Sequence, residues 1–323
     1  MDLSKFHLTE VVACPWDRTN LRPYNGGFIC EDGHEFAVEN DIPILTDAVR
    51  REAVPANMAP CPHDLEDASV DAFVNDWIVN TNGNLYWRAR GRLPRYPIPS
   101  WPFWKGDGKI LVDVGCGWGR WSIASAGAGF RPIGLDVHID ALSAAQRVSK
   151  QLGVQANYLC SSVDRMPFRS ASVDVVFSYS VLQHLDRQTV ARFFKESFRV
   201  LKVGGRCLVQ LPNASGLYNI LLQARRGFRD GSPGTFEMRY WSISSIRDAV
   251  EKAGFHDLAI RTDGFFSQNP QMSDLDLLSL VGKLIVLVSL AARNTARVIP
   301  TLTRFADSLW IECRVVPPAA KLG

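Results

Sequence analysis

The feature that most restricts the fold of this chain is a glycine-rich turn that directly follows an apolar run. The run KILVDV begins at Lys109, and the segment DVGCGWG continues it through Gly119. A strand that is buried on both faces requires such a run of apolar residues. Glycines allow the backbone to turn tightly and to approach a ligand closely. The pattern therefore predicts a buried strand, a ligand-binding loop and a helix over 119–128, in that order.

Predicted strands and helices then alternate along the chain. Helical stretches begin at Ala141 and Arg187, a helix covers 242–253, and strands cover 131–136, 154–160, 173–178, 206–211, 257–262 and 309–315. This alternation is typical of an open, mostly parallel α/β sheet with helices on both faces. The segment 264–308 between the last two strands is too long for a hairpin loop, so we expect it to be helical.

The spacing of the glycines indicates the kind of ligand. Dinucleotide sites use G-x-G-x-x-G, in which the helix N-terminus faces a pyrophosphate, whereas Gly115, Gly117 and Gly119 follow G-x-G-x-G. Asp113 precedes the first glycine by two residues and can attract an ammonium group, directly or through water. Asp136 ends the second strand, where a carboxylate can accept both hydroxyls of a ribose. These features favour S-adenosylmethionine, which carries an ammonium group and no phosphate.

Four segments resemble the successive motifs of class I S-adenosylmethionine-dependent methyltransferases. They are DVGCGWGRWS, GLDVHIDAL, MPFRSASVDVVFSYSVLQHL and RVLKVGGRCLVQLPN. The resemblance covers about 109–213 and, more loosely, 214–262, and the most similar subgroup acts on small molecules and includes ubiquinone-pathway and sugar methyltransferases. It implies an enzyme with a Rossmann-like, seven-stranded, mostly parallel sheet. The last strand, 309–315, would then insert antiparallel between its neighbours.

The resemblance also implies a set of cofactor contacts. Asp113 and the loop residues Gly115, Cys116, Gly117 and Gly119 would hold the amino-acid end, Asp136 the ribose and Val137 one face of the adenine, with Ser162, Val163 and Ser178 completing the set. The family usually has an aspartate five residues before the proline of the Pro-Phe pair, and this chain has Ser162 there. The adenine amino group would then donate to Ser162, which is a weaker acceptor, or to the carboxylate of Asp164 two residues later.

Two other functions are compatible with a similar fold. An NAD-dependent oxidoreductase would have its third glycine one residue later, and a Tyr-x-x-x-Lys or His–Arg pair for hydride chemistry, neither of which stands out. A protein that binds S-adenosylmethionine without turning it over would share Asp113, Gly117 and Asp136, because these residues report binding only. A turnover assay discriminates between the enzyme and the binding protein.

The N-terminal residues resemble a small zinc ribbon. Cys14-Pro-Trp-Asp17 and Cys30-Glu-Asp-Gly-His34 form two short knuckles among short alternating runs. Such ribbons precede some rRNA methyltransferases, and the arrangement suits zinc. Asp17 replaces the usual second cysteine, and carboxylate is a poorer zinc ligand than thiolate. The predicted metal ligands are Cys14, Asp17, Cys30 and His34, with Cys61 or His63 as additional candidates; the alternative is a module held by packing alone.

The charge of this module argues against RNA recognition. Residues 1–47 contain three Lys or Arg and nine Asp or Glu, whereas RNA binding requires basic residues. The formal charge of the whole chain is +3 over 323 residues, which also argues against a nucleic-acid partner. An rRNA or tRNA methyltransferase that uses the ribbon for recognition is therefore the second hypothesis, after a small-molecule methyltransferase.

We divide the chain into three parts. Residues 1–47 form a degenerate zinc-ribbon-like module, 48–107 a linker with a helix, and 108–323 the methyltransferase domain with a helical lid at 264–308. Several of the seven cysteines lie in apolar strand-like runs, which suits buried free thiols in a reducing compartment. The first ten residues have no signal-peptide pattern, and charges interrupt the apolar stretch 275–292. We therefore expect a cytoplasmic protein.

The residues that could contact the methyl acceptor are marked by less specific patterns than the cofactor residues. His184 follows the fourth strand, and its imidazole could take a proton from a hydroxyl acceptor, or it could be a structural histidine that fixes its loop. The aromatic residues Trp118, Trp121 and Tyr179 could face the sulfonium, although such residues more often serve packing. The arginines after the fifth strand are either solvated or converge on an anionic acceptor, and they are Arg225, Arg226, Arg229 and Arg239.

These observations favour a small-molecule acceptor. We expect O-methylation of a sugar, glycolipid or quinone-like compound, anionic or lipid-linked. The stretch 277–292 is apolar on more than one helical face around Lys283, so it is either buried or lies on another apolar surface. Peripheral contact with a membrane would follow if the acceptor is lipid-linked.

Overall fold

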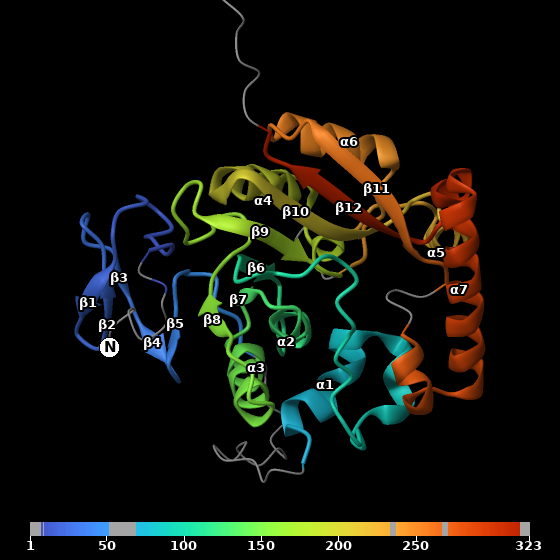
Figure 1. Cartoon of the computed structure of the whole chain (residues 1–323), viewed down its shortest axis with the longest axis horizontal. Helices are drawn as coiled ribbons and strands as arrows, with labels where there is room; N and C mark the ends of the chain where they lie inside the picture. Colours follow the sequence, from blue (N-terminus) through green and yellow to red (C-terminus); the bar gives the residue numbers. More distant parts are fainter. Residues whose placement is uncertain (1–7, 9, 52–68, 233–236, 267–270, 317–323) are drawn as a thin grey trace, which may run out of the picture. The chain divides into compact units, whose positions relative to one another are not determined.

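The computed structural model describes residues 8, 10–51, 69–232, 237–266 and 271–316 (Figure 1). The chain divides into two compact units, one of residues 1–162 with 271–287 and one of 163–270 with 288–323. The predicted metal ligands Cys61 and His63 lie outside the described residues.

The predicted α/β sheet is confirmed. Seven strands follow the order β11-β12-β10-β9-β6-β7-β8. β7 runs parallel to β6 and β8, and β9 runs parallel to β10. β12 (Ser308–Arg314) is antiparallel to both of its neighbours, β10 and β11, as the resemblance implied for the last strand.

The first unit contains the start of the α/β pattern. Its strands are β6 (Ile110–Val114), β7 (Arg131–Asp136) and β8 (Asn157–Cys160), joined by α2 (Arg120–Gly127) and α3 (Ile139–Gln151). β8 is shorter than the predicted 154–160, because the backbone of Val154 closes the end of α3 by donating to Ser149. β7 has the predicted bounds, since its apolar residues are buried as expected.

The helix predicted within 48–107 is α1 (Ala72–Asn82), followed by the 3-10 helix η2 (Asn84–Ala89). Asp71 caps α1 by accepting from the N–H groups of Phe73 and Val74. The same carboxylate accepts from Arg147 of α3 at 2.7 Å, so one buried aspartate starts the helix and also joins it to the α/β domain.

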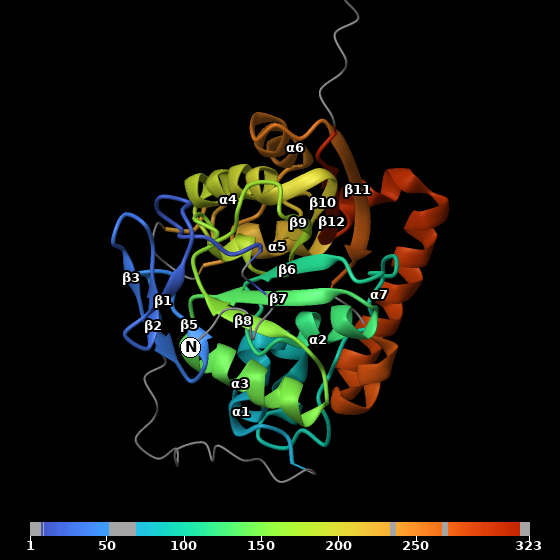
Figure 2. The same ribbon diagram turned by 60° about the vertical axis from the view of Figure 1, so that its left-hand side comes forward.

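The N-terminal module is built of five short strands. β1 (Arg22–Tyr24), β2 (Gly27–Ile29) and β3 (Glu35–Phe36) form one sheet, and β4 (Val38–Glu39) pairs with β5 (Ile42–Pro43). The chain then runs beside β8, where Leu45 donates to the carbonyl of Cys160 at 2.8 Å (Figure 2). Ile42 is fully buried in a cluster with residues of α3 and β8, so the module shares a core with the α/β domain.

The second unit holds the remaining strands, β9 (Val173–Ser178), β10 (Leu201–Pro212) and β11 (Asp257–Gly264). Its helices are α4 (Arg187–Val200), α5 (Leu217–Arg225) and α6 (Ile243–Lys252), with the 3-10 helix η3 (Leu182–His184). β10 begins earlier than predicted because a register shift between Leu201 and Arg206 accommodates the glycine pair between them.

The segment 264–308 is helical where it is described. It forms η4 (Met272–Leu277), α7 (Leu280–Val298) and η5 (Pro300–Phe305). No described helix is long and apolar enough to cross a membrane.

Candidate active site and metal centre

The glycine loop after β6 has the conformation that its sequence predicts. Gly115, Gly117 and Gly119 have φ angles of 73°, 54° and 83°, which favour glycine over other residues. A side chain at Gly119 would meet the hydroxyl of Tyr158 at 2.6 Å, whereas one at Gly117 would meet open space. The loop therefore packs closely against the domain at its end and leaves room for a ligand at its centre.

Asp136 joins this loop to the end of β7. Its carboxylate accepts from the N–H of Gly117 at 2.9 Å and from the N–H of His138 at 3.0 Å. Burial raises the pKa of Asp136 above its ordinary value. The structure thus brings the predicted ribose ligand and the predicted glycine loop into direct contact. Each carboxylate oxygen keeps a second lone pair for a hydroxyl group.

Asp113 lies beneath the loop. Its side chain is only 2% exposed and accepts from the hydroxyl of Ser122 at 2.7 Å. Burial raises the pKa of Asp113 to about 7, Arg120 opposes the rise and Asp136 adds to it. A cationic ligand group nearby would favour the ionised form. Ser122 was not predicted, although it is a polar residue on the buried face of a short helix.

Residues from the N-terminal part of the chain contact the segment that follows Asp136. Val137, the predicted adenine contact, accepts through its carbonyl from the N–H of Arg50 at 2.7 Å, and Ile139 donates to the carbonyl of Arg50 at 3.2 Å. Phe73 and Trp77 of α1 have ring centroids 6.3 and 6.5 Å from that of His138. Sequence reasoning missed these contributions, because residues far apart in the chain make them.

The other predicted cofactor contacts lie at strand ends. Ser162 is half-buried two residues after β8, Val163 follows it, and Ser178 is buried at the end of β9. Asp164, the alternative adenine acceptor, accepts from Arg192 at 2.9 Å. That carboxylate is therefore already paired with an arginine.

The aromatic side chains near the loop serve packing. Trp118 is 1% exposed and directs its ring N–H toward Thr81 and Asn82 of α1. Trp121 is buried, and the Tyr179 hydroxyl donates to Asp263 at 3.0 Å. This burial is consistent with the expectation that these aromatic residues serve packing and do not face a sulfonium.

His184 ends η3 and is half-buried. Its carbonyl accepts from the guanidinium of Arg239 at 3.1 Å. Arg239 is 2% exposed and also donates to the carbonyl of Glu237, so the interpretation of Arg239 as a solvated surface residue is wrong. The guanidinium is used to hold main-chain carbonyls, one of them that of the predicted general base.

The second unit contains an apolar pocket of about 340 Å³. Its lining residues come from α5, α7, η5 and the segment after β11, and they are Leu217, Phe265, Phe266, Ala292, Thr295, Leu302 and Phe305. Phe265 and Phe266 directly follow the carboxyl end of β11, the edge at which α/β sheets bind ligands. None of the predicted arginines lines this pocket.

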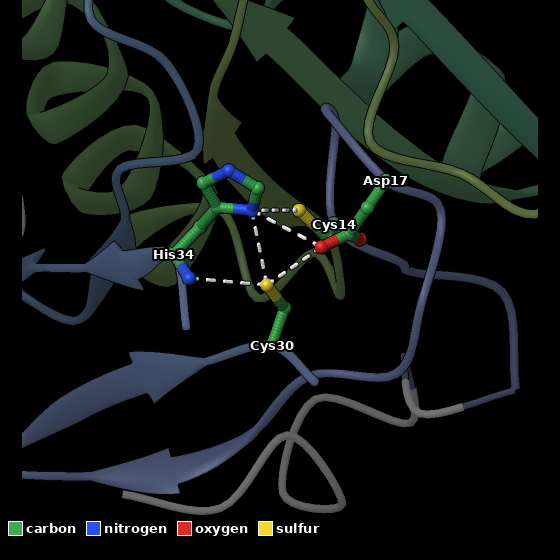
Figure 3. A group of neighbouring side chains, drawn as sticks. All are labelled: Cys14, Asp17, Cys30 and His34. Carbon is green, nitrogen blue, oxygen red and sulfur yellow. Dashed lines mark hydrogen bonds and ion pairs between the residues drawn. The ribbon is translucent and has the colours of Figure 1, made fainter. Parts of the chain in front are cut away.

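The four predicted metal ligands converge in the N-terminal module (Figure 3). One ligand atom from each of Cys14, Asp17, Cys30 and His34 lies within 4.8 Å of all the others. The Cys30 sulfur is 2.8 Å from Asp17 Oδ2 and 3.1 Å from His34 Nδ1. Burial raises the pKa of the Cys14 thiol to about 12.

Comparisons with known proteins match the part of the chain that contains the glycine loop to methyltransferases. Residues 112–209 match the family described as a methyltransferase domain. The chain is 32% identical over 148 residues to a probable S-adenosylmethionine-dependent methyltransferase of Mycolicibacterium smegmatis (46% of this chain, 52% of that protein). It is 30% identical over 153 residues to the biotin biosynthesis bifunctional protein of Cellvibrio japonicus (47% and 29%). It is 32% identical over 111 residues to the ubiquinone biosynthesis O-methyltransferase of Escherichia fergusonii (34% and 45%).

Residues 112–209, which match a methyltransferase domain, contain both the glycine loop and Asp136. The chain spans about half or less of the length of the three relatives.

Proposed function

We propose that this chain is an S-adenosylmethionine-dependent methyltransferase that methylates an oxygen of a small molecule with an apolar part, such as a glycolipid or a quinone-like compound. The observation that carries the cofactor assignment is the contact between Asp136 and the glycine loop, with both carboxylate oxygens fixed at 2.9 and 3.0 Å by main-chain N–H groups. A carboxylate held in this way is pre-organised for the two ribose hydroxyls.

In the proposed site, Asp113 faces the ammonium group of the cofactor and Gly115 to Gly119 follow its amino-acid end. Cys116 lies within that loop. Val137, Ser162 and Val163 would contact the adenine, and Ser178 would lie near the reacting end. In this assignment the roles come from the resemblance to the family, and the geometry of the loop supports them.

Bound S-adenosylmethionine would supply the methyl group for the acceptor oxygen, with Asp113 and the glycine loop holding its amino-acid end and Asp136 its ribose. The hydroxyl proton must depart as the new bond forms, and we assign it to the imidazole of His184. Arg239 supports this role by fixing the His184 carbonyl at 3.1 Å, which limits the positions that the ring can take. Holding the two reactants in line supplies the larger share of the acceleration.

The apolar pocket supports an acceptor with a hydrophobic part. Four of its lining residues are Leu217, Phe265, Phe266 and Phe305, which offer contact area and few polar groups. An anionic acceptor has weaker support, since Arg226 pairs with Glu237 at 3.0 Å and Arg239 binds main-chain carbonyls. The name of the ubiquinone-pathway relative is consistent with O-methylation of an apolar compound.

A lipid-linked acceptor would require contact with a membrane surface, and α7 has a suitable face. Leu280, Val281, Leu284 and Leu287 lie on one side of the helix and are 80%, 67%, 61% and 46% exposed. Residues 277–306 contain four Lys or Arg and no Asp or Glu, which suits an anionic lipid surface. We propose peripheral membrane contact through this face, and a lid function for 264–308.

Calorimetry on the purified chain tests the cofactor assignment. We expect micromolar affinity for S-adenosylhomocysteine and none for NAD. Asp136→Ala removes two charge-assisted hydrogen bonds of about 1.5–3 kcal/mol each, so the affinity should fall at least about 100-fold. Asp257→Ala, which removes an exposed carboxylate from another strand, is the matched control. Tight binding of NAD, or normal cofactor binding by Asp136→Ala, would contradict the proposal.

Metabolite analysis of a deletion strain identifies the acceptor. We expect one compound to be replaced by a form lacking a single methyl group. Wild-type protein should restore the methylated compound, and Asp136→Ala should not. Restoration by Asp136→Ala would show that methyl transfer does not depend on Asp136 and would contradict its assignment to the cofactor.

A further inference from the structure

The cluster of Cys14, Asp17, Cys30 and His34 contains none of the residues assigned to methyl transfer, and three of its polar atoms lie close to one ring nitrogen. The Nδ1 atom of His34 lies 3.1 Å from the Cys30 sulfur, 3.1 Å from Asp17 Oδ2 and 3.7 Å from the Cys14 sulfur. A ring nitrogen has either one hydrogen to donate or one lone pair that accepts, so it cannot form a full hydrogen bond with all three atoms at once. A cation at the centre would be bound by all four groups.

We propose that this cluster is a structural zinc site with one Zn²⁺ per chain. Tetrahedral zinc with bonds of about 2.0–2.3 Å places its ligand atoms about 3.3–3.8 Å apart. Four of the six separations between the ligand atoms are 2.8 to 3.7 Å, and the other two are at most 4.8 Å. Coordination therefore needs shifts of about 1 Å or less.

The surroundings of the cluster match those of metal-bound thiolates. Main-chain N–H groups point at both sulfurs, from Trp16 to Cys14 at 3.4 Å and from His34 to Cys30 at 3.2 Å. Such bonds stabilise negative charge on sulfur. Asp17 is oriented in the same way, because Thr19 donates twice to its Oδ1 and leaves Oδ2 toward the cluster (Figure 3). Outer contacts of this kind orient metal ligands.

The donor set selects the metal and its role. Two thiolates and an imidazole favour zinc over magnesium or calcium, which prefer all-oxygen sites. Four protein side chains fill a tetrahedral shell and leave no open position, which is typical of structural rather than catalytic zinc. Cys14 and Cys30 are both free thiols and buried. The carboxylate of Asp17 makes the site weaker than one with three sulfurs.

Elemental analysis and cobalt substitution of the full chain test the proposal. Wild type and the control Asp32→Asn, which alters an exposed acid of the same module, should contain one zinc each. Cobalt(II) should replace it with the absorption bands of tetrahedral thiolate ligation. In competition with a chromophoric chelator, Cys30→Ser should lose at least tenfold in zinc affinity, and Asp17→Cys should gain at least tenfold.

Three outcomes would overturn the site. The first is a folded wild-type chain that takes up neither zinc nor cobalt at micromolar concentrations. The second is zinc that stays bound with unchanged affinity in both Cys30→Ser and Asp17→Cys. The third is a disulfide between Cys14 and Cys30 in the purified protein. Asp17→Cys keeps the test decisive if Cys30→Ser fails to fold, because it adds a ligand and removes none.

Discussion

The affinity for cofactor should depend on pH through Asp113. The carboxylate is buried beside Ser122, and its pKa is raised to about 7 by burial. If only the ionised form holds the ammonium group of the cofactor, the competent fraction is about 3% at pH 5.5 and about 50% at pH 7.0. The dissociation constant of S-adenosylhomocysteine should therefore fall about 16-fold between these two pH values.

Calorimetry in two buffers with different ionisation enthalpies measures both the affinity and the protons released. At pH 7 the wild type should release about half a proton on binding, since the ligand drives Asp113 to its ionised form. Asp113→Asn should bind weakly at both pH values, with little change between them. A wild-type affinity that changes less than twofold would refute the reasoning. An unchanged pH dependence in Asp113→Asn would also refute it and would point to Asp136, whose pKa burial also raises.

Three other measurements follow. Because folding raises the pKa of Asp113, its contribution to the free energy of unfolding is present below pH 4 and is lost as pH rises through about 7. Asp113→Asn should therefore raise the melting temperature of the cofactor-free protein at pH 8 and not at pH 4. His184→Ala should lower turnover by about 10²–10⁴-fold with cofactor affinity unchanged, and full activity would make His184 structural. Leu284→Glu with Leu287→Glu should abolish co-sedimentation with anionic liposomes, while an absence of lipid binding by the wild type would leave the α7 face as an oligomer contact.

The sequence predicted the parts of the fold that depend on local patterns. The bounds of β7 and β9 follow from apolar runs that are buried on both sides of a parallel sheet. The glycine loop and Asp136 were predicted to bind one ligand, because the carboxyl ends of two neighbouring parallel strands meet at one edge of the sheet. The four metal ligands were predicted from two short knuckles, and their side chains do converge.

The sequence could not predict contacts that depend on long-range packing. The ring N–H of Trp118 points at Thr81 and Asn82, 37 and 36 residues earlier in the chain, and no local pattern marks that pairing. Arginine is usually found at the protein surface, but Arg239 is buried and donates to main-chain carbonyls. The position of Arg239 depends on the contact between η3 and the segment before α6, in which the N–H of Arg239 donates to the carbonyl of Gln183. Such a contact is determined by tertiary structure and not by a local pattern.

The main-chain bonds of Arg50 have a consequence for where the catalytic domain begins. Val137 and Ile139 follow the end of β7, and both bond to the backbone of Arg50. Ile42 and Leu45 are buried, and Ile42 packs against residues of α3 and β8. A fragment cut at the first strand of the large sheet would lose this extra strand-like partner and expose the apolar surface beneath it. A fragment that keeps these contacts therefore has to begin before residue 42, so the N-terminal chain is an integral part of this domain's framework.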